Sequence, residues 1–128
     1  MKVVVVSGGF DPIHSGHIAY FKSAKKLGEK LIVALNSDAW LIKKKEKFFM
    51  PFEERKIIVE NLSMVDEVIN FEDDEAGSAS QALEKIKELH PNDEIIFCNG
   101  GDRTEENIPE MQVSNISFKS VSYTHLRA

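Results

Sequence analysis

The sequence lacks the features that mark disulfide-rich secreted proteins, membrane-spanning proteins and basic nucleic-acid-binding domains. Cys98 is the only cysteine among 128 residues, so no disulfide can form within the chain. No apolar run approaches the ~18 residues that span a bilayer, and the residues after Met1 do not follow a signal-peptide pattern. The formal net charge of -5 argues against an extended nucleic-acid surface. These absences predict a cytoplasmic protein that binds neither membranes nor nucleic acid.

Short apolar runs alternate with amphipathic stretches along the chain. This alternation is typical of strands and helices that follow one another in an α/β domain with a parallel sheet. The apolar runs predict strands over Val3–Ser7, Leu31–Leu35, Glu67–Phe71 and Glu94–Cys98. Helical spacing predicts one helix over His17–Leu27, a second that starts near Pro51 and continues through Val65, and a third that carries Ala82 to Leu89. The expected fold is a Rossmann-like parallel sheet between helices.

Glycine pairs follow two of the predicted strands. Gly8 and Gly9 end the first strand, and Gly100 and Gly101 follow the fourth. Ligands of parallel α/β sheets bind beyond the carboxyl ends of the strands. The two glycine pairs therefore indicate where a ligand binds.

The segment from Gly8 to His17, Gly-Gly-Phe-Asp-Pro-Ile-His-Ser-Gly-His, has the composition of a phosphate-binding turn. Its glycines allow close approach of the backbone to a phosphate chain, and the helix that follows directs its positive end to the same space. His14 and His17 are three residues apart, so both imidazoles face one side of the turn. They can donate hydrogen bonds to phosphate oxygens. A structural turn or a metal pair are the alternatives, although no further ligand cluster supports a metal.

This segment resembles the signature of the cytidylyltransferase-like superfamily, whose shorthand is the HxGH motif. The resemblance covers nearly all of residues 1 to 104 and includes the nucleotidyltransferases that act on glycerol 3-phosphate and on heptose phosphates. It continues through Ala24–Gly28, Asn36–Asp38, Glu54–Lys56, Val65–Ile69 and Gly100–Asp102.

The resemblance implies roles for the residues of the first turn. Phe10 and Asp11 would hold the triphosphate loop, and His14 and His17 would contact the phosphates and stabilise the transition state. An Asp at this position can also cap the turn through its own side chain, which leaves the role of Asp11 open. The turn glycines that would admit the nucleotide are Gly8, Gly9 and Gly16.

The resemblance also implies roles for residues beyond the first turn. Lys44, in a basic segment expected to form a loop over the site, would neutralise phosphate charge. Arg55 would do the same from the following helix, although an ordinary surface ion pair is the alternative. The nucleoside-binding turn would comprise Gly100, Gly101 and Asp102.

Two departures from the family pattern concern the same chemistry. Glu46 stands where the glycerol-3-phosphate enzymes carry a second lysine. The Ser/Thr-rich segment that opens the family's last helix has no counterpart after Ser117. We therefore expect one nucleotidyltransferase domain over residues 1–118 and a non-native or truncated tail over residues 119–128.

The resemblance implies transfer of CMP or AMP from CTP or ATP to a phosphorylated small-molecule acceptor, with release of pyrophosphate. Mg²⁺ would accompany the triphosphate, and a homodimer is a further expectation because relatives are often dimers. Two alternatives stay open. One is an acid–amine ligase that forms an adenylate at a similar turn, for which the chain is short. The other is a nucleotide-binding module without catalytic activity.

Overall fold

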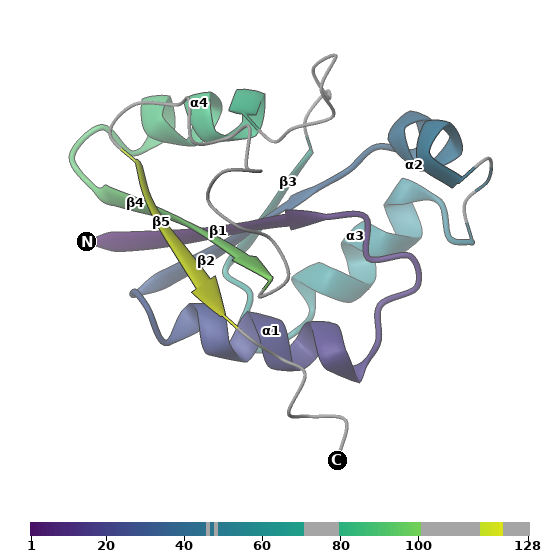
Figure 1. Ribbon diagram of the computed structural model, residues 1–128, viewed down its shortest axis with the longest axis horizontal. Helices are drawn as coiled ribbons and strands as arrows, with labels where there is room; N and C mark the ends of the chain where they lie inside the picture. Colours follow the sequence, from purple (N-terminus) through teal and green to yellow (C-terminus); the bar gives the residue numbers. More distant parts are fainter. Residues whose placement is uncertain (46, 48, 71–79, 101–115, 122–128) are drawn as a thin grey trace.

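The computed structural model describes residues 1–45, 47, 49–70, 80–100 and 116–121. Its centre is a sheet of five parallel strands in the order β3-β2-β1-β4-β5 (Figure 1). This order reverses direction between β1 and β4, as in Rossmann-like folds. The fold class predicted from the sequence is confirmed. The strands are β1 (Lys2–Gly8), β2 (Lys30–Leu35), β3 (Glu67–Asn70), β4 (Glu94–Gly100) and β5 (Ile116–Val121).

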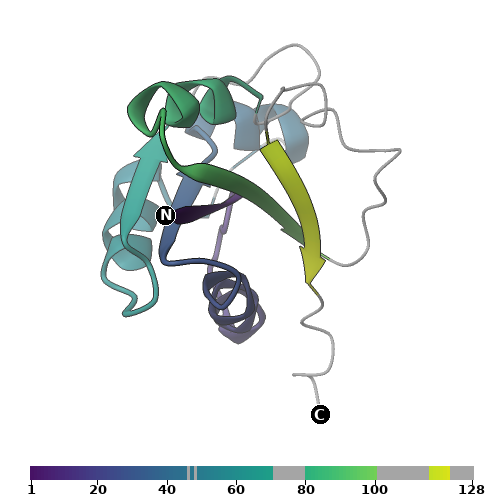
Figure 2. The ribbon, with the colours of Figure 1, turned by 90° about the vertical axis from the view of Figure 1, so that its left-hand side faces the viewer.

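Helices cover both faces of this sheet. Helix α4 lies against one face, whereas α1 and α3 lie against the other, as the two perpendicular views show (Figures 1 and 2). Helix α2 follows β2 at the carboxyl edge of the sheet (Figure 1). The bounds are α1 (Ser15–Lys25), α2 (Asp38–Lys45), α3 (Phe52–Glu60) and α4 (Ser80–Leu89).

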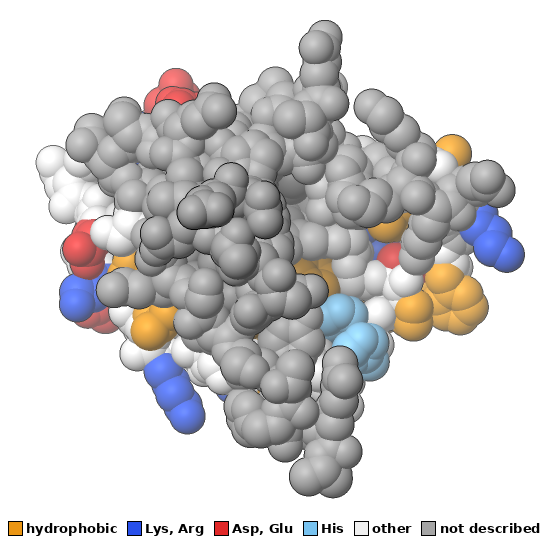
Figure 3. Space-filling model, viewed as in Figure 1, with side chains coloured by type: hydrophobic (Ala, Val, Ile, Leu, Met, Phe, Trp, Pro, Cys, Tyr) orange, Lys and Arg blue, Asp and Glu red, His pale blue; other side chains and the backbone are white. Residues whose placement is uncertain are grey.

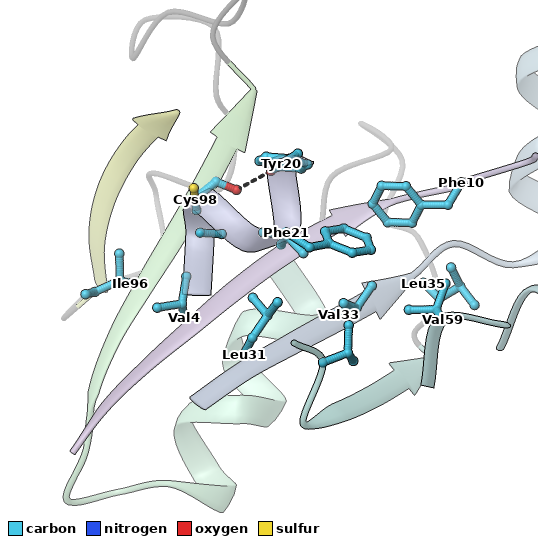
Figure 4. Packing of buried hydrophobic residues seen from close by; sticks show 13 residues of the cluster. Val4, Phe10, Tyr20, Phe21, Leu31, Val33, Leu35, Val59, Ile96 and Cys98 are labelled. Carbon is cyan, nitrogen blue, oxygen red and sulfur yellow. Dashed lines mark hydrogen bonds between the residues drawn. The ribbon is translucent and has the colours of Figure 1, made fainter. Parts of the chain in front are cut away.

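The middle of the central strand β1 is an unbroken run of four valines, because both faces of the strand are buried there. Val3 and Val5 pack in the cluster beneath α4, and Val4 and Val6 pack in the cluster beneath α1 and α3. Each of the four valines is 0% exposed. The second cluster also contains Phe10, which joins the turn after β1 to the core (Figure 4).

Helix α2 corrects one expectation from the sequence. The basic segment that begins at Lys43 was expected to be a loop, but Lys43 to Lys45 form the last turn of α2. The cause is local. Asp38 in the first turn and lysines in the last turn both complement the helix dipole, and Ala, Leu and Lys are good helix formers.

Strand β5 was not predicted from the sequence. It pairs in parallel with β4, from Ile95 opposite Ile116 to Gly100 opposite Val121, so it crosses position 118, where we expected the domain to end. The signal was present, since Ile116-Ser-Phe-Lys119 alternates apolar and polar residues as an edge strand does.

The predicted ends of helices differ from those observed by a few residues. Helix α1 begins two residues before the predicted His17, because His14 serves as its N-cap. Pro51 is the N-cap of α3 in an extended conformation (φ -66°, ψ 160°) rather than part of its first turn. That helix ends at Glu60, so Val65 does not belong to it. Val65 is buried all the same, and it lies in the segment that follows the helix. Among the described residues, no helix is both long enough and apolar enough to cross a bilayer.

Candidate nucleotide-binding site

Phe10 anchors the turn after β1 to the hydrophobic core. Phe10 adopts φ 50°, a left-handed conformation that is uncommon for any residue other than glycine. The residue is only 7% exposed, and its ring meets Phe21 edge-on, with 5.0 Å between ring centroids (Figure 4). Gly8 lies directly beneath this ring, and a Cβ there would be 2.8 Å from Phe10 Cζ. The glycine thus leaves the space into which the aromatic ring folds.

His14 and His17 cap helix α1 and orient each other. The N–H of Gly16 donates to His14 Nδ1 at 3.1 Å, and the N–H of His14 donates to His17 Nδ1 at 3.1 Å. The two rings stack with centroids 3.9 Å apart. Because each Nδ1 accepts a hydrogen bond, each neutral ring carries its proton on Nε2. Both side chains can therefore present an Nε2–H donor to an anion.

The environment of His17 keeps its imidazole neutral at physiological pH. Burial, and secondarily the neighbouring His14, lower the pKa of His17 to about 4. The edge of Phe10 contributes to this burial, since its ring centroid lies 5.0 Å from that of His17. Figure 3 shows imidazole surface exposed where β1 gives way to α1. The neutral ring keeps its Nε2–H, which can donate a hydrogen bond to negative charge at this edge.

Asp11 connects the same turn to the segment before α3. Its carboxylate accepts the backbone N–H groups of Phe49 and Met50, each at 2.5 Å. The side chain thus joins two segments that are 38 residues apart in the sequence. The two roles considered from the sequence were a cap of its own turn and a contact to the triphosphate, whereas these two hydrogen bonds hold a distant backbone segment.

Arg55 is completely buried, at 0% exposure, and its guanidinium contacts protein atoms. Nε donates to the carbonyl of Met50 at 3.0 Å, and Nη1 donates to the carbonyls of Gly9 and Asn36 at 2.9 and 2.8 Å. Nη2 pairs with Asp38 Oδ1 at 2.7 Å. The alternative considered from the sequence, an ordinary surface ion pair, does not apply, since the guanidinium is buried and its carboxylate partner lies at the start of α2.

The remaining predicted residues are placed in part. Gly100 is the last residue of β4, next to β1 in the sheet, so the two glycine-bearing ends share one edge as predicted. Gly101 and Asp102 lie outside the described residues. Lys44 lies in the last turn of α2, and the structure describes its backbone but not its side chain.

Sequence reasoning missed the partners of Arg55. Asn36 is 4% exposed at the end of β2, and Asp38 begins α2. A polar Asn directly after five buried apolar residues was the available signal. Its backbone N–H donates to the carbonyl of Gly8 at 3.0 Å, which ties the ends of β1 and β2 together.

Cys98 and Tyr20 lie in structural positions. Cys98 is buried, and burial raises the pKa of its thiol to about 12, so it is a poor nucleophile. Its carbonyl accepts the Tyr20 hydroxyl at 2.7 Å (Figure 4). In the described part of the chain, no group of three His, Cys, Asp or Glu side chains is arranged to hold a metal ion.

The model of the family described as cytidylyltransferase-like matches residues 5–126, which include the whole turn between β1 and α1. The chain belongs to the cytidylyltransferase-like family. This membership confirms the resemblance seen in the HxGH motif.

Curated relatives of this chain include bifunctional proteins that are much longer. The chain is 39% identical over 112 residues to the bifunctional protein HldE of Enterobacter sp. (strain 638), and 38% identical to HldE of Salmonella arizonae. Each alignment covers 79% of this chain and 24% of the relative. The chain thus spans about a quarter of the length of these relatives.

Solved structures share the fold at lower identity. A lipopolysaccharide core biosynthesis protein from Thermoplasma volcanium GSS1 has a TM-score of 0.74 and 23% identity, with 95% of this chain and 97% of that protein covered. A candidate nicotinate-nucleotide adenylyltransferase from Vibrio parahaemolyticus has a TM-score of 0.66 and 17% identity, with 96% and 74% covered. At these identities the likeness concerns the fold alone.

Proposed function

We propose that this domain is a nucleotidyltransferase that transfers CMP or AMP from CTP or ATP to a phosphorylated small molecule and releases pyrophosphate. The observation that carries the proposal is the pair of imidazoles with their Nε2–H groups free of the helix cap, beside the glycine turn of a cytidylyltransferase-like chain. Such donors suit the charge that develops on phosphate oxygens during transfer.

The proposed reaction is a direct displacement. An oxygen of the acceptor's phosphate attacks the α-phosphorus, the new O–P bond forms, and the bond between the α-phosphorus and the bridging oxygen breaks. The electron pair leaves with pyrophosphate, so no covalent enzyme intermediate is required. His14 and His17 donate to the phosphate oxygens, while the backbone of the Gly9–Phe10 turn holds the triphosphate. Lys44 offsets phosphate charge from the end of α2.

Mg²⁺ is proposed to arrive with the triphosphate as part of the substrate. Magnesium in such sites is commonly held by substrate phosphates and water, with few protein ligands. The proposed nucleoside contacts from Gly100, Gly101 and Asp102 rest on the family resemblance.

The direct test is a pyrophosphate-release screen. CTP and ATP are each supplied with glycerol 3-phosphate, sugar 1-phosphates and other phosphorylated alcohols, and the product is identified as a phosphodiester-linked nucleotide. Release that requires one nucleotide and one acceptor supports the proposal. Nucleotide binding in calorimetry without pyrophosphate release from any pair would instead indicate a non-catalytic binding module, and an amide product would indicate a ligase.

Replacement of either histidine tests the assigned donors. His14→Ala and His17→Ala should each lower kcat on the order of 10²-fold, as loss of a transition-state donor does. His90→Ala is the matched control, because His90 pairs with Asp93 at the opposite edge of the sheet, 3.1 Å from its carboxylate. Turnover of both site variants within twofold of the control would contradict the assignment.

A further inference from the structure

The position of Arg55 differs from that of an arginine that meets a substrate. The side chain is 0% exposed, and its guanidinium donates to three backbone carbonyls in addition to Asp38. These carbonyls come from the turn after β1, the end of β2 and the segment before α3. Guanidinium groups are suited to such convergence because they present five donors in a fixed plane. The Arg55 network, defined as Arg55, Asp38 and the carbonyls of Gly9, Asn36 and Met50, therefore joins the segments around the proposed phosphate site.

One of these carbonyls belongs to the turn that would bind the phosphates. In a trans peptide unit the C=O and N–H groups point in opposite directions. The Gly9 carbonyl points into the buried guanidinium at 2.9 Å, so the N–H of Phe10 in the same peptide unit points away from the interior. Within the described chain, the Phe10 N–H has no protein acceptor. A backbone donor turned outward beside two imidazoles is a contact that a phosphate oxygen can use.

We propose that Arg55 is a positioning residue that fixes the orientation of the Gly9–Phe10 peptide so that the Phe10 N–H binds the triphosphate. Asp38 supports it by balancing the charge of the guanidinium and holding its plane. The inference rests on the proposed function. It differs from a direct phosphate contact because the guanidinium stays on the protein throughout the reaction.

Asp38 offers a variant for which the two roles predict opposite results. Asp38→Asn keeps an oxygen acceptor but removes the charge that holds the guanidinium. If Arg55 positions the peptide, a loosened guanidinium raises the KM for the nucleotide. If Arg55 binds phosphate directly, release from the carboxylate frees it for the substrate and lowers that KM.

The experiment measures KM and kcat for the nucleotide, and its Kd by calorimetry, in Arg55→Lys, Asp38→Asn and a control. Arg55→Lys should raise KM by about tenfold and Asp38→Asn by about threefold, which is the scale of one or two weakened hydrogen bonds, with smaller changes in kcat. Partial unfolding alone would lower apparent kcat and leave KM unchanged, since the folded molecules keep the native site. Thermal unfolding of each variant sets a temperature at which it is folded.

Asp66→Asn is the control. Asp66 pairs with a cation, Lys25, as Asp38 pairs with Arg55, and it accepts the Leu31 N–H at 2.7 Å, but it lies at the amino end of β2. Its KM should stay within twofold of the wild type. A lower KM in Asp38→Asn, or unchanged KM in both site variants, overturns the positioning role while the wild type still turns over. If Arg55→Lys does not fold, Asp38→Asn decides. A wild-type protein that binds neither CTP nor ATP overturns the proposed function, and this inference with it.

Discussion

The conformation of Phe10 depends on the absence of a side chain at Gly8. Phe10 holds a left-handed backbone while its ring is buried against Phe21 and His17, so the ring must fold back over the end of β1. Left-handed backbone at a residue with a bulky side chain costs on the order of 1–3 kcal/mol and persists where the surroundings require it. Here the surroundings are the contacts of the Phe10 ring with Phe21 and with the imidazole of His17.

Gly8→Ala should therefore destabilise the domain by about 1–3 kcal/mol, the usual cost of overpacking. The added methyl group would lie 2.8 Å from Phe10 Cζ and displace the ring. A double-mutant cycle in urea unfolding with Phe10→Ala measures the origin of the loss, because the methyl group meets little once the ring is gone. Strict additivity of the two losses would show that the Phe10 ring is not what the methyl group meets.

At the scale of the element, helix α1 combines its own stabilisation with the chemistry of the site. Its N-cap is a histidine rather than the usual Ser, Thr, Asp or Asn, and its first turn holds no acidic residue. The imidazoles of His14 and His17 accept the N–H groups that a carboxylate or hydroxyl would otherwise take. The hydrogen bonds that stabilise the helix end thereby also fix both tautomers.

This arrangement predicts a pH dependence of stability. The pKa of His17 is lowered to about 4 from the ordinary value of 6.5, so the unfolded chain binds the proton more tightly than the folded chain. Between about pH 4 and pH 6.5 the free energy of unfolding therefore rises with pH. Above about pH 6.5 the contribution of His17 is constant. The gain is below the full value of the shift, because the imidazole is only partly buried.

His17→Asn isolates this contribution, because the Asn oxygen can accept the His14 N–H but does not titrate in this range. Urea unfolding of both proteins between pH 4 and pH 8 should show the wild type losing more stability on acidification. Parallel curves for the two proteins across that range would mean that protonation of His17 does not oppose folding.

At the scale of the whole molecule, the sequence was sufficient for the fold class and for the shared edge of the two glycine-bearing strand ends. The valine run of β1 must be buried on both faces, and glycines at the ends of β1 and β4 mark the edge where ligands bind in such sheets. These signals are local in the sequence. The residues from Gly8 to His17 are consecutive, so the sequence alone was enough to recognise them as one motif.

The contacts that join distant segments could not be predicted. The burial of Arg55 depends on three carbonyls from separate segments, and the role of Asp11 depends on backbone donors 38 and 39 residues away. A charged side chain in a helical pattern reads as exposed until its tertiary partners are known. Helix α2 was missed because a run of lysines reads as a solvated loop, and β5 because one edge strand carries a weak apolar signal.

The central claim is that the turn between β1 and α1 binds the phosphates of a nucleotide. A crystal structure of the protein with CTP or ATP bound tests it most directly. The account predicts phosphate oxygens within hydrogen-bond distance of the Phe10 N–H and of Nε2 of His14 and His17, with Arg55 still on the Gly9 carbonyl. A triphosphate bound away from this turn, or imidazoles rotated so that Nε2 no longer faces it, would contradict the account.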